Sequence, residues 1–116
     1  MIIINFKELI RYNFPLNIQN NFGNTALIWA LINKYNIEII KLLIDTGADV
    51  NIQNKNGFTA LIYATIDNNI EITKLLIVSG ADVNIKNNNG TTALILANRN
   101  DRKEIIELLK SKGAKE

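Results

Sequence analysis

The sequence repeats with a period of 33 to 34 residues, and this period limits the possible folds more than any other feature. The segment GNTALIWA at residues 23–30 recurs as GFTALIYA at 57–64 and as GTTALILA at 90–97. A fixed period of this length is typical of proteins that stack copies of one small structural unit. We therefore expect an array of stacked units.

Two further segments recur in the same register. The sequence EIIKLLI at 38–44 returns as EITKLLI at 71–77 and, in a weaker form, as EIIELLK at 104–110. The sequence GADVNI at 47–52 is repeated letter for letter at 80–85. Because both spacing and letters agree over three units, the repeat is a specific signal.

Each unit predicts two helices followed by a loop. A threonine precedes the first apolar run of every unit, where its hydroxyl can cap a helix N-terminus. After a polar break, Ile72, Leu75 and Leu76 have the spacing of a second helix. Gly80 then ends this helix, as a C-terminal glycine commonly does. A single unit cannot bury its apolar face alone, so the units must stack.

The repeats indicate where the helices should lie. The extra residue of the first unit should fall between its two helices, at 33–36, because loops absorb insertions at little cost. Leu42 and Leu75 should be core side chains of the second helices. We expect seven helices, near residues 2–12, 25–33, 37–46, 59–67, 70–79, 92–99 and 103–112.

The units resemble ankyrin repeats, whose pattern combines a period of about 33 residues, a TPLHxA opening and an LLxxGADVN ending. The resemblance covers about residues 14–115. The family's proline is alanine in all three units, and its histidine is isoleucine at residues 28, 62 and 95. Alanine is tolerated in the first helical turn, and isoleucine should replace the lost hydrogen bond by apolar burial. The resemblance implies an all-α solenoid of helix–turn–helix units with short inter-repeat hairpin loops.

The ends of the array differ from its interior. Lys110 stands where Ile44 and Ile77 stand in the earlier units, and Glu8 takes the place of Leu42. Polar residues at these positions suit an outer face that has no neighbouring unit. We therefore expect one ankyrin-repeat domain over 1–116, with an N-terminal capping half-repeat at 1–19 and repeats at 20–53, 54–86 and 87–116, the last a C-terminal cap.

The composition excludes most catalytic designs. The chain has no cysteine and no histidine, so it lacks thiolate nucleophiles and both the commonest general base and the commonest metal ligand. Its glutamates at residues 38, 71 and 104 share one repeated position at the start of a second helix, where a carboxylate favours the helix dipole. We expect no enzyme activity, no cofactor and no metal.

The charge distribution gives no sign of a nucleic-acid or membrane partner. The net charge is +2 and is spread evenly, whereas a nucleic-acid binder should show a basic face or stripe. No apolar run approaches the roughly 18 residues of a membrane-spanning helix. We expect a monomeric chain in the cytoplasm, or in a host cell if the source is a parasite, symbiont or virus.

The resemblance implies a protein partner, held on the concave face that loop tips and first helices form. Positions that vary between units should not be required for the fold. Exposed apolar groups at these positions mark interaction sites. Phe58 is the first choice, because its counterparts in the other units are polar. The candidate partner-binding residues are Phe22, Asn24, Ile32, Asn33, Lys55, Asn56, Phe58, Ile66, Asp67, Asn89, Thr91 and Arg99.

Two alternatives stay open. Phe22 and Phe58 could instead pack between adjacent loops, and Trp29, Tyr63 and Leu96 share a position that we expect to fill the core, with the ring edges reaching solvent. The chain could also be a fragment or scaffold segment of a larger ankyrin-repeat protein, with no dedicated partner of its own.

The capping role of Lys110 generates a first prediction. A Lys110→Ile change should leave the free energy of unfolding within about 0.5 kcal/mol, as surface changes do. It should also promote self-association, because it restores an apolar stacking face. Sedimentation velocity at high concentration measures this, and a variant that stays monomeric contradicts the capping role.

Overall fold

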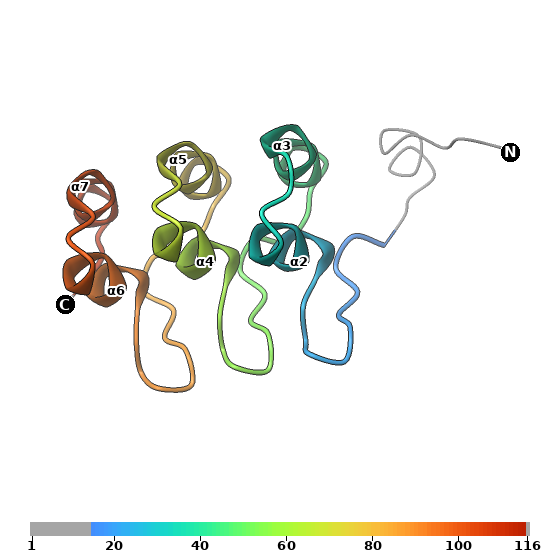
Figure 1. Cartoon of the computed structure of the whole chain (residues 1–116), viewed down its shortest axis with the longest axis horizontal. Helices are drawn as coiled ribbons and strands as arrows, with labels where there is room; N and C mark the ends of the chain where they lie inside the picture. The colour runs from blue at the N-terminus through green and yellow to red at the C-terminus, as the bar shows by residue number, and fades with distance from the viewer. Residues whose placement is uncertain (1–14, 116) are drawn as a thin grey trace, which may run out of the picture.

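The computed structural model describes residues 15–115, which form six helices and no strand. Each observed helix lies within an expected one, and the expected ranges differ only by including cap residues. The seventh expected helix, at 2–12, lies outside the described residues. The helices are α2 (Ala26–Ile32), α3 (Ile37–Asp45), α4 (Ala60–Ile66), α5 (Ile70–Val78), α6 (Ala93–Arg99) and α7 (Lys103–Ser111) (Figure 1).

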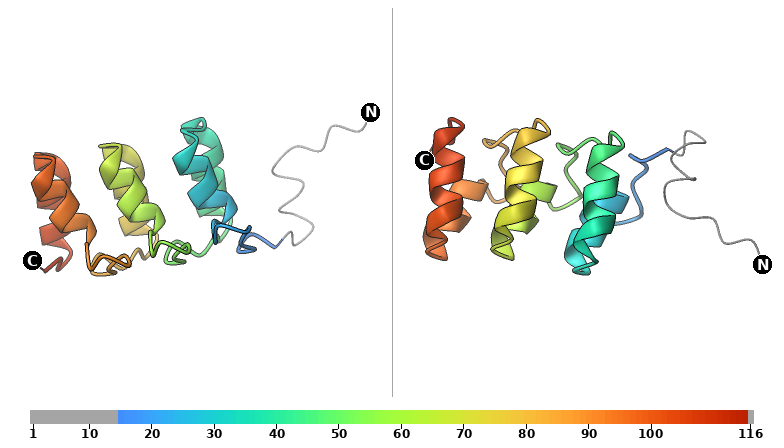
Figure 2. Two further views of the ribbon diagram at one scale, coloured as in Figure 1. Left: turned by 60° about the horizontal axis from the view of Figure 1, so that its bottom comes forward. Right: turned by 90° about the horizontal axis from the view of Figure 1, so that it is seen from above.

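The helices form two layers. The first helices of the repeats, α2, α4 and α6, form one layer, and the second helices, α3, α5 and α7, form the other (Figure 1). The loops between repeats extend from the first-helix layer, on the side away from the second helices (Figure 1). The second helices run side by side along the stack (Figure 2). Each repeat therefore contacts only its neighbours, as in a solenoid.

Threonine caps start all three first helices. The Oγ1 atoms of Thr25, Thr59 and Thr92 accept hydrogen bonds from backbone N–H groups three residues later, at 3.2, 3.3 and 3.2 Å. The threonines are almost completely buried, so water cannot replace these bonds. The prediction of threonine caps is confirmed.

The turn between the two helices of the first repeat is one residue longer than the others. It spans residues 33–36, whereas the later turns span 67–69 and 100–102. Tyr35 donates its backbone N–H to Ala30, and Asn69 and Arg102 make the same bond in their repeats. Asn36 is therefore the additional residue, and its side chain caps α3 by accepting from the N–H of Glu38 at 2.7 Å. The predicted place of the insertion is confirmed.

The core lies between the two layers. Leu27 and Leu61 of the first helices face Leu43 and Leu76 of the second helices, and each of these side chains is at most 2% exposed. Ile28 and Ile62 are 1% exposed, which confirms burial at the position of the family's histidine in the first two repeats, whereas Ile95 in the last repeat is only half-buried.

The expectation that Leu42 and Leu75 are core residues is wrong, because both side chains are only half-buried. Neighbouring positions on a helix point about 100° apart, so only one leucine of each pair can face the other layer. Leu43 and Leu76 take that position, while Leu75 packs on the edge of the core.

Asparagine side chains bind each loop to the next. The Asn51 Oδ1 atom accepts from the N–H of Asp82 at 2.7 Å, and its Nδ2 donates to the carbonyl of Gly80 at 3.1 Å. Asn84 makes the same pair of bonds one repeat later. Asp82 in turn accepts from the N–H of Asn84 at 2.9 Å, as expected of an aspartate in a loop.

Glycines bring the tips of adjacent loops into backbone contact. The N–H of Asn88 donates to the carbonyl of Asn56 at 3.1 Å, and Gly57 lies beside this bond with φ +81°. A Cβ atom on Gly57 would lie 2.6 Å from the nitrogen of Asn88. Gly90, in the last loop, has the similar φ of +77° but open space around it.

Because Gly57 and Gly90 share a positive φ but only Gly57 is crowded, substitutions at the two positions separate the cost of backbone strain from the cost of crowding. Gly90→Ala should cost only the penalty of a left-handed alanine, about 1–2 kcal/mol. Gly57→Ala should cost about 1–3 kcal/mol more, because the new methyl group meets backbone that cannot move aside. Urea unfolding of the two variants measures the difference, and equal losses would contradict the role of close loop contact.

Candidate partner-binding surface

Exposed apolar side chains are concentrated at one end of the array. The described residues contain seven large apolar side chains that are exposed, and five of them lie between residues 18 and 35. The others are Ile66 on α4 and Val78 on α5. The five are Ile18, Phe22, Trp29, Ile32 and Tyr35, with exposed fractions from 40% to 72%.

The expectation that Trp29 fills the core is wrong, because this side chain is 42% exposed. Its ring packs edge-on against Tyr35, with the centroids 4.9 Å apart and an interplanar angle of 89°. Tyr63 and Leu96, at the same position in later repeats, are half-buried against the core. The Tyr63 hydroxyl accepts a hydrogen bond from Asn54, which also donates to Asn24 in the loop of the preceding repeat. Trp29 has no corresponding contact in the described residues, because no described repeat precedes its own.

One variable loop position has a structural role, contrary to the expectation that it is free. Thr91 is only 8% exposed, so the structure removes it from the candidate surface. Phe58 is half-buried and packs on Tyr63, with the ring centroids 5.1 Å apart. Asn24 accepts a hydrogen bond from Asn54 at 2.9 Å and so ties its loop to the next one. Three different side chains thus fill one structural position.

The remaining candidates are exposed and lie in two rows. The first row is at the loop tips, and the second row is at the C-terminal ends of the first helices. A first helix of seven residues, about 10 Å long at 1.5 Å per residue, lies between the two rows in each repeat. The loop row is Phe22, Lys55, Asn56 and Asn89, and the helix-end row is Ile32, Asn33, Ile66, Asp67 and Arg99.

Sequence reasoning missed the exposure of Ile18, Trp29 and Tyr35. Tyr35 could have been found, since the four-residue turn that contains it occurs in the first repeat alone. The exposure of Trp29 depends on which repeats flank it, and its own unit carries no sign of that.

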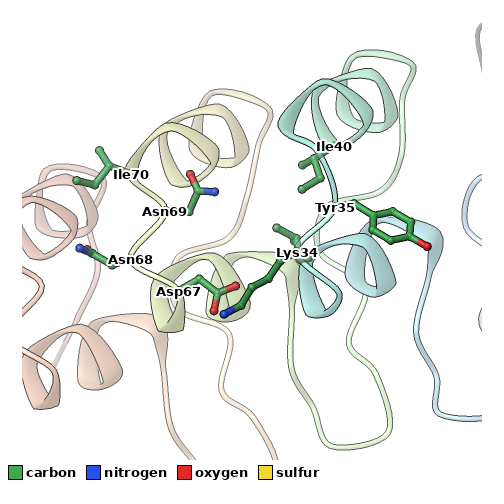
Figure 3. A pocket seen from close by; sticks show the side chains of 8 residues that line it. Lys34, Tyr35, Ile40, Asp67, Asn68, Asn69 and Ile70 are labelled. Carbon is green, nitrogen blue, oxygen red and sulfur yellow. The ribbon is translucent and has the colours of Figure 1, made fainter.

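A cleft of about 420 Å³ opens where the turn before α3 faces the turn before α5 (Figure 3). Its floor is apolar and its mouth is polar, and it borders the helix-end row at Asp67. The lining residues are Leu31, Lys34, Tyr35, Ile40, Asp67, Asn68, Asn69 and Ile70.

The second-helix layer carries an ion pair. Lys41 donates to the Glu71 carboxylate at 2.7 Å and so joins α3 to α5. The hydrogen bond with Glu71, together with its charge, raises the pKa of Lys41. Both side chains are substantially exposed, and a pair of this kind contributes little to stability.

The described residues offer no metal site and no membrane span. They contain no group of three or more acidic residues placed to hold a metal ion. Between residues 15 and 115, no helix is long and apolar enough to cross a membrane.

Stacked helix pairs joined by protruding loops define a helical repeat protein. The family model described as ankyrin repeats (3 copies) matches residues 4–87 and 32–116. The two matches together span nearly the whole chain, so the chain belongs to the ankyrin-repeat family. Ankyrin repeats are generally protein–protein interaction modules and typically not enzymes. No curated protein matches the chain.

The two loop phenylalanines should respond differently to truncation. Phe58→Ala should lower the free energy of unfolding by about 1–3 kcal/mol, because it removes partly buried apolar area and an aromatic contact. Phe22→Ala should change it by less than about 0.5 kcal/mol, because the side chain is mostly exposed. Thermal or urea unfolding compares them, and a large loss for Phe22→Ala would show that this ring packs between loops.

Proposed function

We propose that the chain is a non-enzymatic protein-interaction module that binds a protein partner through its loop tips and first helices, the concave face in the family. The observation that carries the proposal is the uneven distribution of exposed apolar side chains. Of the seven in the described residues, six lie in the loops, the first helices and the first turn, and Val78 alone lies on a second helix. Apolar exposure concentrated on one side is typical of an interaction surface.

Ile32 and Ile66 are suited to anchor the partner. They occupy the same position in α2 and α4, which contact each other. Contacting helices lie about 8–10 Å apart, so the two side chains form a pair at roughly that spacing. Asn33 and Asp67 follow them as exposed cap residues, and Arg99 ends the row. Apolar anchors with a polar rim are the usual anatomy of a binding hot spot.

The alternative, a scaffold segment without a partner of its own, gives no reason for Ile66, which is exposed on α4 although described repeats lie on both sides of it. Phe22 is also 72% exposed at a loop tip. Phe22 also stands where the other loops carry asparagine, so the fold does not require an aromatic ring there.

A protein is a better partner for this surface than a nucleic acid or a membrane. Its charged members, Lys55, Asp67 and Arg99, have mixed signs, whereas nucleic-acid binding needs a basic stripe. The proposal further includes a monomeric chain that acts in the cytoplasm, or in a host cell if the source is a parasite, symbiont or virus.

Truncating the anchors should weaken binding without unfolding the chain. The partner is first captured from the native lysate with the chain as bait and identified by mass spectrometry. Ile32→Ala, Ile66→Ala and Phe22→Ala should each weaken its binding by about 1–3 kcal/mol in calorimetry, the range of a hot-spot truncation.

Val78→Ala is the matched control, since it removes an exposed apolar side chain from α5, on the other layer. It should leave the affinity unchanged. If Val78→Ala weakens binding while the three anchor variants do not, the recognition surface is the second-helix layer and the proposal fails.

A further inference from the structure

An arginine of the chain itself bridges repeats 2 and 3. Arg102 lies in the turn before α7, and its side chain reaches back over the preceding repeat. Its Nη2 atom lies 3.5 Å from the carbonyl oxygen of Ile66, the last residue of α4, at the long limit of a hydrogen bond. Helix ends leave such carbonyls without an intrahelical partner, so a guanidinium is a suitable donor there.

The interval between repeats 1 and 2 has no such side chain. Asn69 is the counterpart of Arg102, because each donates its backbone N–H to the carbonyl five residues earlier at 2.9 Å. The short side chain of Asn69 caps its own helix by accepting from the N–H of Ile72 at 3.1 Å. The cleft of about 420 Å³ opens in this interval (Figure 3). Pockets of roughly 300–1,000 Å³ hold small ligands, so a single long side chain fits.

The floor of the cleft suits the aliphatic stem of such a side chain. It contains Leu31 and Ile40, which are 3% and 2% exposed. In the next interval, the same positions are Thr65 and Thr73, whose hydroxyls bond to carbonyls of their own helices. Long cationic side chains bury their stems on apolar surface and keep their charge at the rim.

The mouth of the cleft provides a carboxylate that can bind a guanidinium group. Asp67 and Lys34 point toward one another across it (Figure 3), and Asp67 is exposed. A guanidinium binds a carboxylate with two parallel N–H donors, which a lysine ammonium cannot do. An arginine can therefore bind the Asp67 carboxylate beside Lys34 and still direct a donor to the end of α2.

We propose that the cleft between repeats 1 and 2 receives an arginine side chain of the protein partner, in the way that Arg102 bridges repeats 2 and 3. The proposal rests on the proposed function only in that a partner protein supplies the arginine. Asp67 belongs both to the cleft and to the helix-end row. An arginine bound there lies next to the apolar anchors Ile32 and Ile66 and fixes the register of the partner on them.

The cleft can be tested without the partner. The probe is the peptide acetyl-Gly-Arg-Gly-amide, titrated into the isotopically labelled full chain and followed by proton–nitrogen correlation spectra. The amide signals of Asn68 and Asn69 should shift with saturation, at a dissociation constant on the order of a few millimolar, as expected for one side chain. The same peptide with citrulline, which has the shape of arginine without its charge, should bind at least fivefold more weakly.

Two pairs of variants locate the binding. Asp67→Asn should weaken arginine-peptide binding at least fivefold, whereas Asp45→Asn, which removes the same charge at the end of α3, should not. Asn69→Arg places an arginine at the position of Arg102 and should abolish the peptide-induced shifts, while Asn69→Gln should preserve them. Circular dichroism of each variant checks that the helices remain.

Equal binding of the arginine and citrulline peptides would overturn the proposal, and so would shifts that persist in Asn69→Arg. The absence of any shift at Asn68 and Asn69 would overturn it as well. None of these results bears on the anchors Phe22, Ile32 and Ile66, which are tested with the captured partner. Failure of the cleft and failure of the proposed function are therefore separate outcomes.

Discussion

The spacing of the repeats is set where the backbones of adjacent loops meet. Each meeting point needs a glycine, because a Cβ atom on Gly23 or Gly57 would lie 2.7 or 2.6 Å from a backbone nitrogen of the next loop. The contact allows Lys55 and Asn88 to donate their N–H groups across the interval at 3.0 and 3.1 Å. With the loops at this distance, the Asn51 side chain can accept from the N–H of Asp82 and donate to the carbonyl of Gly80 in the following loop. The helices then pack in register, because each is joined directly to its loop.

Because the spacing is fixed, a sequence difference between two repeats changes what lies in the space between neighbouring repeats. The same geometry that brings α2 beside α4 also brings α4 beside α6, so the side chains at the turns decide what fills each interval. Arg102 bridges one of them, and a cleft lined in part by Asn69 lies in the other. The lining of the cleft includes Asn69, which stands at the repeated position of Arg102, and Tyr35 of the lengthened turn. Ile32, Ile66 and Arg99 form a row because they hold the same repeated position at the ends of α2, α4 and α6.

The parts of the fold that could be predicted from the sequence are those that depend on one unit alone. Helix positions, threonine caps and the place of the extra residue follow from local spacing and capping chemistry, and the structure confirms them within residues 15–115. The burial of Trp29, Phe58 and Thr91 could not be predicted in this way, since it depends on which loop or repeat covers each side chain. The choice of Leu43 over Leu42 as the core residue depends likewise on how the second helix is rotated against the first.

Variation between units is therefore an incomplete guide to a binding surface. The position occupied by Asn24, Phe58 and Thr91 varies fully, yet its side chains bond or pack within the array. A stacked fold tolerates different side chains at an interval as long as each fills it, so variation there reports local packing. The position of Ile32, Ile66 and Arg99 carries isoleucine in two repeats and arginine in the third, and its side chains remain exposed. Only positions that combine variation with exposure are left for recognition, and in this chain they lie at the loop tips and at the ends of the first helices.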